Sequence, residues 1–156
     1  MAITIPAYAD DKMLNGSDTL VYVNIGTTAA PDMKAVAHST SSQITHNAET
    51  KDRQTKDTGI WKKKRVTGLA VSVKTDALVA LDTSVCSYPQ LLEKHKAGEP
   101  VYLKYALKTE KAGDSFEEGW FIITSIDKTD AAAEDSTMSV SFENTGEVKT
   151  STVPTV

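Results

Sequence analysis

Residues that could perform catalysis are few in this sequence, and their spacing forms no catalytic or metal-binding motif. The three histidines, His38, His46 and His95, lack the close spacing of metal-binding pairs. Cys86 is the only cysteine, so it has no partner for a disulfide or a CxxC motif. There is no glycine-rich phosphate loop and no GxSxG elbow. We therefore expect no enzymatic activity, no metal and no cofactor.

The segment that most suggests a function is the polar, charged stretch Glu49–Arg65. It has neither the apolar period of a helix nor that of a buried strand, so we expect a long loop between strands. Connections of this length are uncommon in compact domains and are usually functional or disordered. The stretch also places Trp61 directly before the four cations Lys62–Arg65. This composition is typical of a segment that becomes ordered against something outside its own subunit.

The cationic run at residues 62–65 could pair with phosphate, with acidic residues of its own segment or with acidic residues of a neighbouring subunit. It could contact phosphate, although a solvated loop whose charges pair with Asp52 and Asp57 is favoured over nucleic-acid binding. It could also pair with acidic patches of a neighbouring subunit, such as Asp130–Asp135 or Glu117–Glu118. The residues that we expect to contact another subunit or ring are Asp52, Arg53, Lys56, Asp57, Ile60, Trp61, Lys62, Lys63, Lys64 and Arg65.

Length and composition predict one soluble globular domain. The chain has 156 residues, of which 40% are hydrophobic and 24% charged. Its net charge of −4 makes it a poor candidate for gripping nucleic acid over its whole surface. No apolar stretch is long enough to span a membrane, and the first residues do not resemble a secretion signal. Together with the lone cysteine, this favours synthesis in the cytoplasm.

Stretches rich in β-branched and aromatic residues alternate with polar turns along most of the chain. The stretch 120–126 is the most apolar, and we expect it to be covered on both faces. Within 66–75, Leu69, Val71 and Val73 share one face, and Gly68 is a candidate for a bulge. The predicted strands span residues 20–25, 34–39, 43–48, 66–75, 101–107, 120–126 and 138–142.

One helix is predicted over Pro89–Ala97, with Pro89 in its first turn and Gly98 just past its end. Residues 1–18 and 147–156 show no core pattern, so we expect an N-terminal and a C-terminal arm around a domain at residues 19–146. Successive strands without a βαβ rhythm predict a mainly β fold. The expected architecture is an antiparallel β-sandwich or barrel with one short flanking α-helix, a long inter-strand loop at residues 49–65 and terminal arms.

Several sequence segments, in this order and spacing, are similar to one protein family. The most specific are AETKD at residues 48–52, KDTGIW at 56–61 and SVSFENTG at 139–146. Supporting segments lie at residues 20–26, 34–39, 96–101 and 119–125. From about Leu20 to Gly146, the chain resembles the major tail tube proteins of long, non-contractile phage tails, which phages and prophages encode.

The resemblance implies a structural protein of the virion. Six β-sandwich subunits would join edge strands into a ring, and stacked rings would form the conduit for genome ejection. The long loop, here residues 49–65, would reach the adjacent ring. Implied partners are further copies of the chain, the tape measure protein, and tail tip and terminator proteins. DNA would pass as non-specific cargo, no membrane would be involved, and synthesis would take place in the host cytoplasm.

Two other functions fit parts of the sequence. A secretion-system tube protein would share the same architecture, and gene neighbours would separate it from a phage tail protein. A β-sandwich adhesion or carbohydrate-binding module would expose an aromatic platform. Trp61, Tyr102 and Trp120 are the candidates for such a platform, but we interpret them as core or interface residues.

Overall fold

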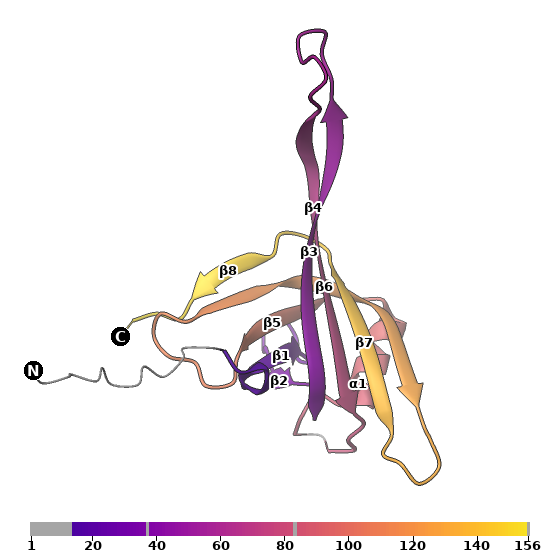
Figure 1. The fold of residues 1–156 in the computed structure, drawn as a ribbon. Coiled ribbons are helices and arrows are strands. Elements are labelled where there is room, and N and C mark those ends of the chain that lie inside the picture. Colours follow the sequence, from indigo (N-terminus) through magenta and orange to yellow (C-terminus); the bar gives the residue numbers. More distant parts are fainter. Residues whose placement is uncertain (1–13, 37, 83, 156) are drawn as a thin grey trace, which may run out of the picture.

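Antiparallel strands dominate the computed structural model, which describes residues 14–36, 38–82 and 84–155 (Figure 1). Eight strands and one α-helix follow a short 3-10 turn in this part of the chain. The elements are η1 (Gly16–Asp18), β1 (Thr19–Asn24), β2 (Met33–Ala35), β3 (Ser39–Arg53), β4 (Lys63–Leu78), α1 (Tyr88–Ala97), β5 (Val101–Leu107), β6 (Ser115–Thr129), β7 (Thr137–Asn144) and β8 (Lys149–Thr152).

One long strand, β6, connects two halves of a strongly bent sheet. The strand order is β2-β1-β5-β6-β7-β4-β3, and β8 pairs with β6 outside this path. The first part of β6 pairs with β5 and β8, and the second part pairs with β7. A register shift between Ile123 and Ser125 marks the change, as bulges commonly do where a strand bends. The sheet is not closed into a barrel.

The core lies between the two halves of the sheet. Alternation puts every second residue of the central strands inside, including Val21 and Val23 of β1 and Val140 and Phe142 of β7. Helix α1 covers one side of β6, with Leu91 fully buried. Its His95 Nδ1 lies 3.0 Å from the Ile123 carbonyl oxygen, which ties the helix to the strand.

Helix α1 has the ends that the sequence predicts. The Ser87 N–H donates to the Gln90 side chain over 3.1 Å, and Pro89 occupies the first turn. Gly98 ends the helix in the left-handed conformation at φ 67°, where glycine avoids the strain of a Cβ. Cys86, just before the helix, is fully buried, and this burial raises the pKa of its thiol to about 12. It behaves as a small apolar residue of the core.

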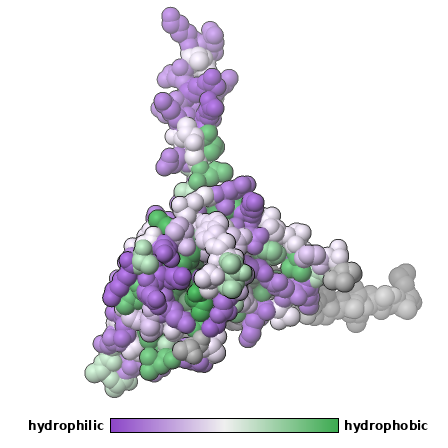
Figure 2. Space-filling view, turned by 180° about the vertical axis from the view of Figure 1, so that it is seen from behind, coloured by the Kyte–Doolittle hydropathy of each residue, from purple (hydrophilic) through white to green (hydrophobic). Residues whose placement is uncertain are grey.

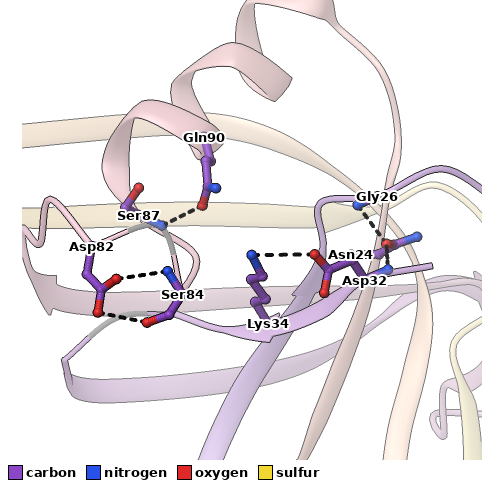
Figure 3. A network of polar contacts seen from close by, with 8 residues as sticks. All are labelled: Asn24, Gly26, Asp32, Lys34, Asp82, Ser84, Ser87 and Gln90. Atoms are coloured by element: carbon purple, nitrogen blue, oxygen red, sulfur yellow. Dashed lines mark hydrogen bonds and ion pairs between the residues drawn. The ribbon is translucent and has the colours of Figure 1, made fainter. Parts of the chain in front are cut away.

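A buried amide holds the turn between β1 and β2 (Figure 3). The Asn24 Oδ1 accepts hydrogen bonds from the N–H groups of Gly26 at 3.0 Å and Asp32 at 2.9 Å. Asp32 also forms an ion pair with Lys34 at 3.4 Å. Gly26 packs so closely that a Cβ there would lie 2.4 Å from the Ala30 carbonyl oxygen.

Several sequence predictions differ from the structure at the ends of elements. The predicted strand at 34–39 is confirmed only as Met33–Ala35, followed by a single bridge between Val36 and Cys86. The C-terminal arm contains β8, because β6 is long enough to offer a second pairing edge. Of the N-terminal arm, residues 1–13 lie outside the described part, and residues 14–18 are exposed.

The prediction that residues 120–126 are covered on both faces is wrong for the subunit. Phe121 and Ile123 are buried, but Trp120 and Ile122 are 40% and 38% exposed. The reason is that the helix and the second half of the sheet cover one face of β6 only. No helix of the described residues is long and apolar enough to cross a membrane.

Substitution of Gly26 tests the close packing of the β1–β2 turn. Gly26→Ala should lower the free energy of unfolding by about 1–3 kcal/mol, since backbone atoms must move to admit the methyl group. Urea unfolding followed by circular dichroism would measure the change. Gly16→Ala is the control, because nothing lies within 4 Å of a Cβ at that site. Equal effects of the two substitutions would contradict the packing argument.

A buried hydroxyl in β4 offers a second test of the core. Thr75 is fully buried, and its Oγ1 has no hydrogen-bond partner among the described residues. Thr75→Val keeps the shape and removes the unpaired group, so it should raise the free energy of unfolding by about 1 kcal/mol. Thr75→Ser keeps the hydroxyl and loses a methyl, so it should lower this free energy. Thermal unfolding of both variants would show whether the hydroxyl destabilises the core.

Candidate functional site: a projecting hairpin and open strand edges

Strands β3 and β4 run past the body of the protein as a two-stranded hairpin (Figure 1). Thr50–Arg53 pair with Lys63–Val66 outside the core. From Ala48 to Arg53 the strand rises roughly 17 Å at about 3.4 Å per residue. The nine residues that join the two strands lie farther out still. The hairpin is therefore the part of the subunit best placed to reach another molecule.

The structure corrects the prediction that residues 49–65 form a loop without strand structure. β3 continues to Arg53 and β4 begins at Lys63, so only residues 54–62 are irregular. The sequence pattern did not reveal the strands because both faces of the ribbon meet solvent. Without a buried face, a strand has no reason to alternate apolar and polar residues.

The tip of the hairpin is held by a small turn and carries exposed apolar groups. The Thr58 hydroxyl lies 2.7 Å from the Thr55 carbonyl oxygen and 3.1 Å from the Thr55 backbone nitrogen. Ile60 is 90% exposed and Trp61 79% exposed. Exposed large apolar groups at the end of a projection favour contact with a partner. All ten residues predicted to contact another subunit are exposed on this hairpin.

The hairpin is cationic and the rest of the chain acidic. Residues 49–65 hold seven basic and three acidic residues, a formal charge of +4, which leaves −8 for the remainder of a chain of net charge −4. Figure 2 shows hydrophilic side chains over most of the hairpin and hydrophobic ones gathered where it joins the body. Val66 and Leu69, 54% and 77% exposed, belong to that region. Leu69 lies on the same face of β4 as the buried Val71 and Val73, as predicted, but its side chain is exposed because the hairpin parts from the core there.

Internal pairing does not neutralise this charge. The predicted partner Asp52 lies opposite Lys64 in the ladder. None of the ion pairs within 4.0 Å between described residues involves residues 49–65. The two acidic patches predicted for a neighbour differ in availability. Glu117 pairs with His46 at 3.1 Å and Glu118 accepts from Ser151 at 3.3 Å, whereas the turn at residues 130–135 is fully exposed.

Open strand edges remain in the described part of the subunit at β2, which pairs as a strand only with β1, and at β3 and β8. β3 pairs only with β4, and β8 pairs only with β6. An open edge presents unpaired N–H and C=O groups that another strand can bind. Beside β8, Trp120 packs edge-to-face on Tyr102 with ring centroids 5.3 Å apart. These features indicate a subunit whose edges are completed by other copies.

The structure does not bring the candidate catalytic residues together. His38 lies in a turn with a positive φ of 45°, His46 contacts Glu117, and His95 contacts the backbone of Ile123. The described residues contain no group of three or more His, Cys, Asp or Glu side chains that could hold a metal. The observed contacts of His46 and His95 are structural.

Comparison with known proteins identifies the family. A sequence model described as phage tail tube protein matches residues 13–150, which is most of the chain. The chain belongs to the phage tail tube protein family. No curated protein sequence matches it. It is a structural tail tube protein, as the sequence resemblance predicted.

Several solved structures have a fold similar to that of this chain. A chain in the tail of an empty gene transfer agent particle, refined with C6 symmetry, has a TM-score of 0.75 at 18% identity and covers 89% of this tail tube protein and 99% of that chain. The SPP1 tail tube has a TM-score of 0.73 at 11% identity, covering 92% of this chain and 81% of that one. A chain of the anti-feeding prophage baseplate has a TM-score of 0.61 at 9% identity, covering 96% and 98%.

Fluorescence of the hairpin tip would show whether it becomes buried in the assembled tube. The chain has two tryptophans, so a Trp120→Phe variant emits from Trp61 alone. Its quenching by acrylamide should be strong in the free subunit and fall severalfold in the tube, because an exposed indole that joins an interface is shielded from the quencher. A Trp61→Phe variant reports on Trp120 and so gives the quenching of the body of the subunit for comparison. Equal quenching of Trp61 in both states would show that the tip takes no part in assembly.

Proposed function

We propose that this tail tube protein closes into hexameric rings, and that the rings stack into a tube through which the genome passes. The observation that carries the proposal is the cationic hairpin that projects from the body without covering any part of its own core. The sixfold symmetry of the gene transfer agent tail supports the number of subunits. A protein of this kind acts by its shape and its contacts, so the proposed role is non-enzymatic.

Ring closure follows from the open edges of the sheet. The bent sheet leaves β3 and β8 with unpaired edges on each subunit. Two different edges that meet form a heterologous contact, which closes into a ring when the rotation per subunit divides a full turn. Closure would remove the open edges and extend the sheet around the channel. The half-exposed Trp120 and Ile122 lie on β6, opposite Tyr102 of β5 and Glu143 of β7, and a neighbouring subunit would cover them.

Stacking follows from the hairpin. A two-stranded ribbon without apolar cover is marginally stable in water, so a partner surface is needed to hold it in one position. The exposed Ile60 and Trp61 at its tip would supply apolar contact, and the cations of its stem would supply attraction to an acidic surface. Because both act on the next ring, the hairpin would set the direction in which the tube grows.

The proposed partners beyond the chain itself are the tape measure protein inside the tube and the tail tip and terminator proteins at its ends. DNA would be passing cargo. The body, with a formal charge of −8 outside the hairpin, is unsuited to strong binding of a polyanion. The proposed location is the tail of a virion, after synthesis in the host cytoplasm.

Sedimentation and negative-stain microscopy across a concentration series would test assembly. Rings or tubes should form as the concentration rises, and higher salt should shift the onset to higher concentration because exposed charges are screened. The subunit fold should stay unchanged by circular dichroism over the same salt range, which is the control. A monodisperse monomer at every concentration, at low salt and with purified tail tip complex added, would refute the proposal.

A further inference from the structure

The register of the hairpin gathers cations on one face. Lys51 lies opposite Arg65, and Arg53 lies opposite Lys63. Opposite residues of an antiparallel pair share a face, and so do residues two apart on one strand. These four residues therefore form one face of the ribbon, which we name the cation face. The other face carries Thr50 and Asp52 opposite Val66 and Lys64, a pairing with balanced charge.

A bulge creates this arrangement. The ladder shifts by one residue between Glu49 and Thr50, and Thr67 is the extra residue, with its hydroxyl 3.2 Å from the Glu49 carbonyl oxygen. Without the shift, Lys51 would lie opposite Val66 and Arg53 opposite Lys64, which leaves a single pair of like charge. The observed register instead sets two pairs of like charge directly across from each other, which destabilises an isolated ribbon. A feature that opposes folding of the free subunit favours a role in binding an anionic partner.

The complementary surface lies at the other end of the same strand. β4 runs from Lys63 at the outer end of the hairpin to Leu78, which pairs with Thr137 beside the β6–β7 turn. Sixteen residues of strand separate the two ends by roughly 50 Å. Figure 1 shows the hairpin and this turn at opposite ends of the subunit. One subunit therefore presents cations at one end and acids at the other.

The turn at residues 130–135 is available for binding. Asp130 accepts a hydrogen bond from Ser136, which lowers the pKa of its carboxyl group, and it lies 3.5 Å from Lys128. Glu134 and Asp135 are exposed, and no ion pair within 4.0 Å joins them to another described residue. Their carboxylates are thus left to face solvent or a second subunit. Leu81, 89% exposed, lies in the segment that follows β4 at the same end.

We infer that the cation face of one subunit binds the acidic β6–β7 turn of a subunit in the next ring. This rests on the proposed function and adds the partner surface of the hairpin. The occupant is a second copy of the chain because the two surfaces have opposite charge and lie at opposite ends of one molecule. A head-to-tail contact of this kind repeats without closing and so builds a filament.

Charge reversal on the cation face tests the inference. Lys63→Glu combined with Arg65→Glu replaces both like-charge pairs by opposite-charge pairs, so the free subunit should be at least as stable as the wild type. Tube growth should nevertheless need at least about tenfold more protein, because the charges of the four residues then cancel and the attraction of this face to the acidic turn is lost. The matched control is Lys62→Glu with Lys64→Glu. It makes the same change in charge at the residues that directly precede Lys63 and Arg65, and Lys64 lies on the other face of the ribbon. Lys64→Glu faces Asp52, so this control adds repulsion within the hairpin. The concentration that it needs for growth should rise clearly less than that of the cation-face variant.

Reversal of the partner surface completes the experiment. Glu134→Lys with Asp135→Lys should also raise the concentration needed for growth, because the turn then repels the cation face. The four substitutions together should recover part of the growth that the turn variant loses, because a face without net charge no longer repels the reversed turn. Sedimentation and negative-stain microscopy at low salt provide the measurement. Normal tubes from the cation-face variant, equal loss in the control, or failure of the fourfold variant to recover would each overturn the inference and leave stacked rings as the function.

Two further outcomes separate the possible failures. A random-sequence DNA duplex with a fluorescent label measures phosphate binding by anisotropy. If the wild type binds it tightly, the cation-face variant does not, and the turn variant assembles normally, then the ligand of the face is phosphate and the inference is wrong. If the wild type forms neither rings nor tubes and does not self-associate at low salt, the proposed function and the inference fail together.

Discussion

The pairing of β3 with β4 is the interaction on which the rest of the structure depends. A strand must satisfy its backbone N–H and C=O groups, and these two strands do so for each other well beyond the core. Near the body, one face of β4 buries Val71, Val73 and Thr75. Beyond Leu69 the same ladder continues with both faces in solvent. The same strand pair therefore connects the folded core to the proposed contact surface, with a bulge between them, and leaves the outer edge of β3 open.

Different parts of this strand pair stabilise the subunit and offer side chains for contact with a partner. The apolar side chains that stabilise the subunit belong to the body, where Phe121, Phe142 and Leu103 are almost fully buried. The hairpin buries none of them, so changes in its side chains alter contacts without altering the core. This separation lets the charge of the hairpin vary while the fold persists.

The sequence revealed elements that have one buried face and missed those that have none. Strands β1, β5 and β7 and helix α1 were predictable, since alternation or the signals at Pro89 and Gly98 mark them. The outer parts of β3 and β4 and the strand β8 could not be predicted. Most of their side chains face solvent, so no core imposes an alternation of apolar and polar residues on them. The ten contact residues were predicted from composition alone. Their division into two faces depends on the bulge beside Gly68, and the one-residue register shift cannot be read from residue types.

Weak contacts between charged residues can have a large combined effect when every subunit of a ring repeats them. A like-charge pair across two strands destabilises a ribbon by roughly 0.2–1 kcal/mol, which a folded body tolerates easily. In the proposed ring, every copy would present the same cation face to the same acidic turn, so contacts of modest strength would act together on one stacking step. Each contact between exposed charges weakens with salt, and their sum weakens more steeply. Free subunits would then stay apart while single contacts form and break, whereas a completed ring would hold the next one. Like-charge pairing that disfavours an isolated hairpin thus favours growth on an existing ring over premature association in solution.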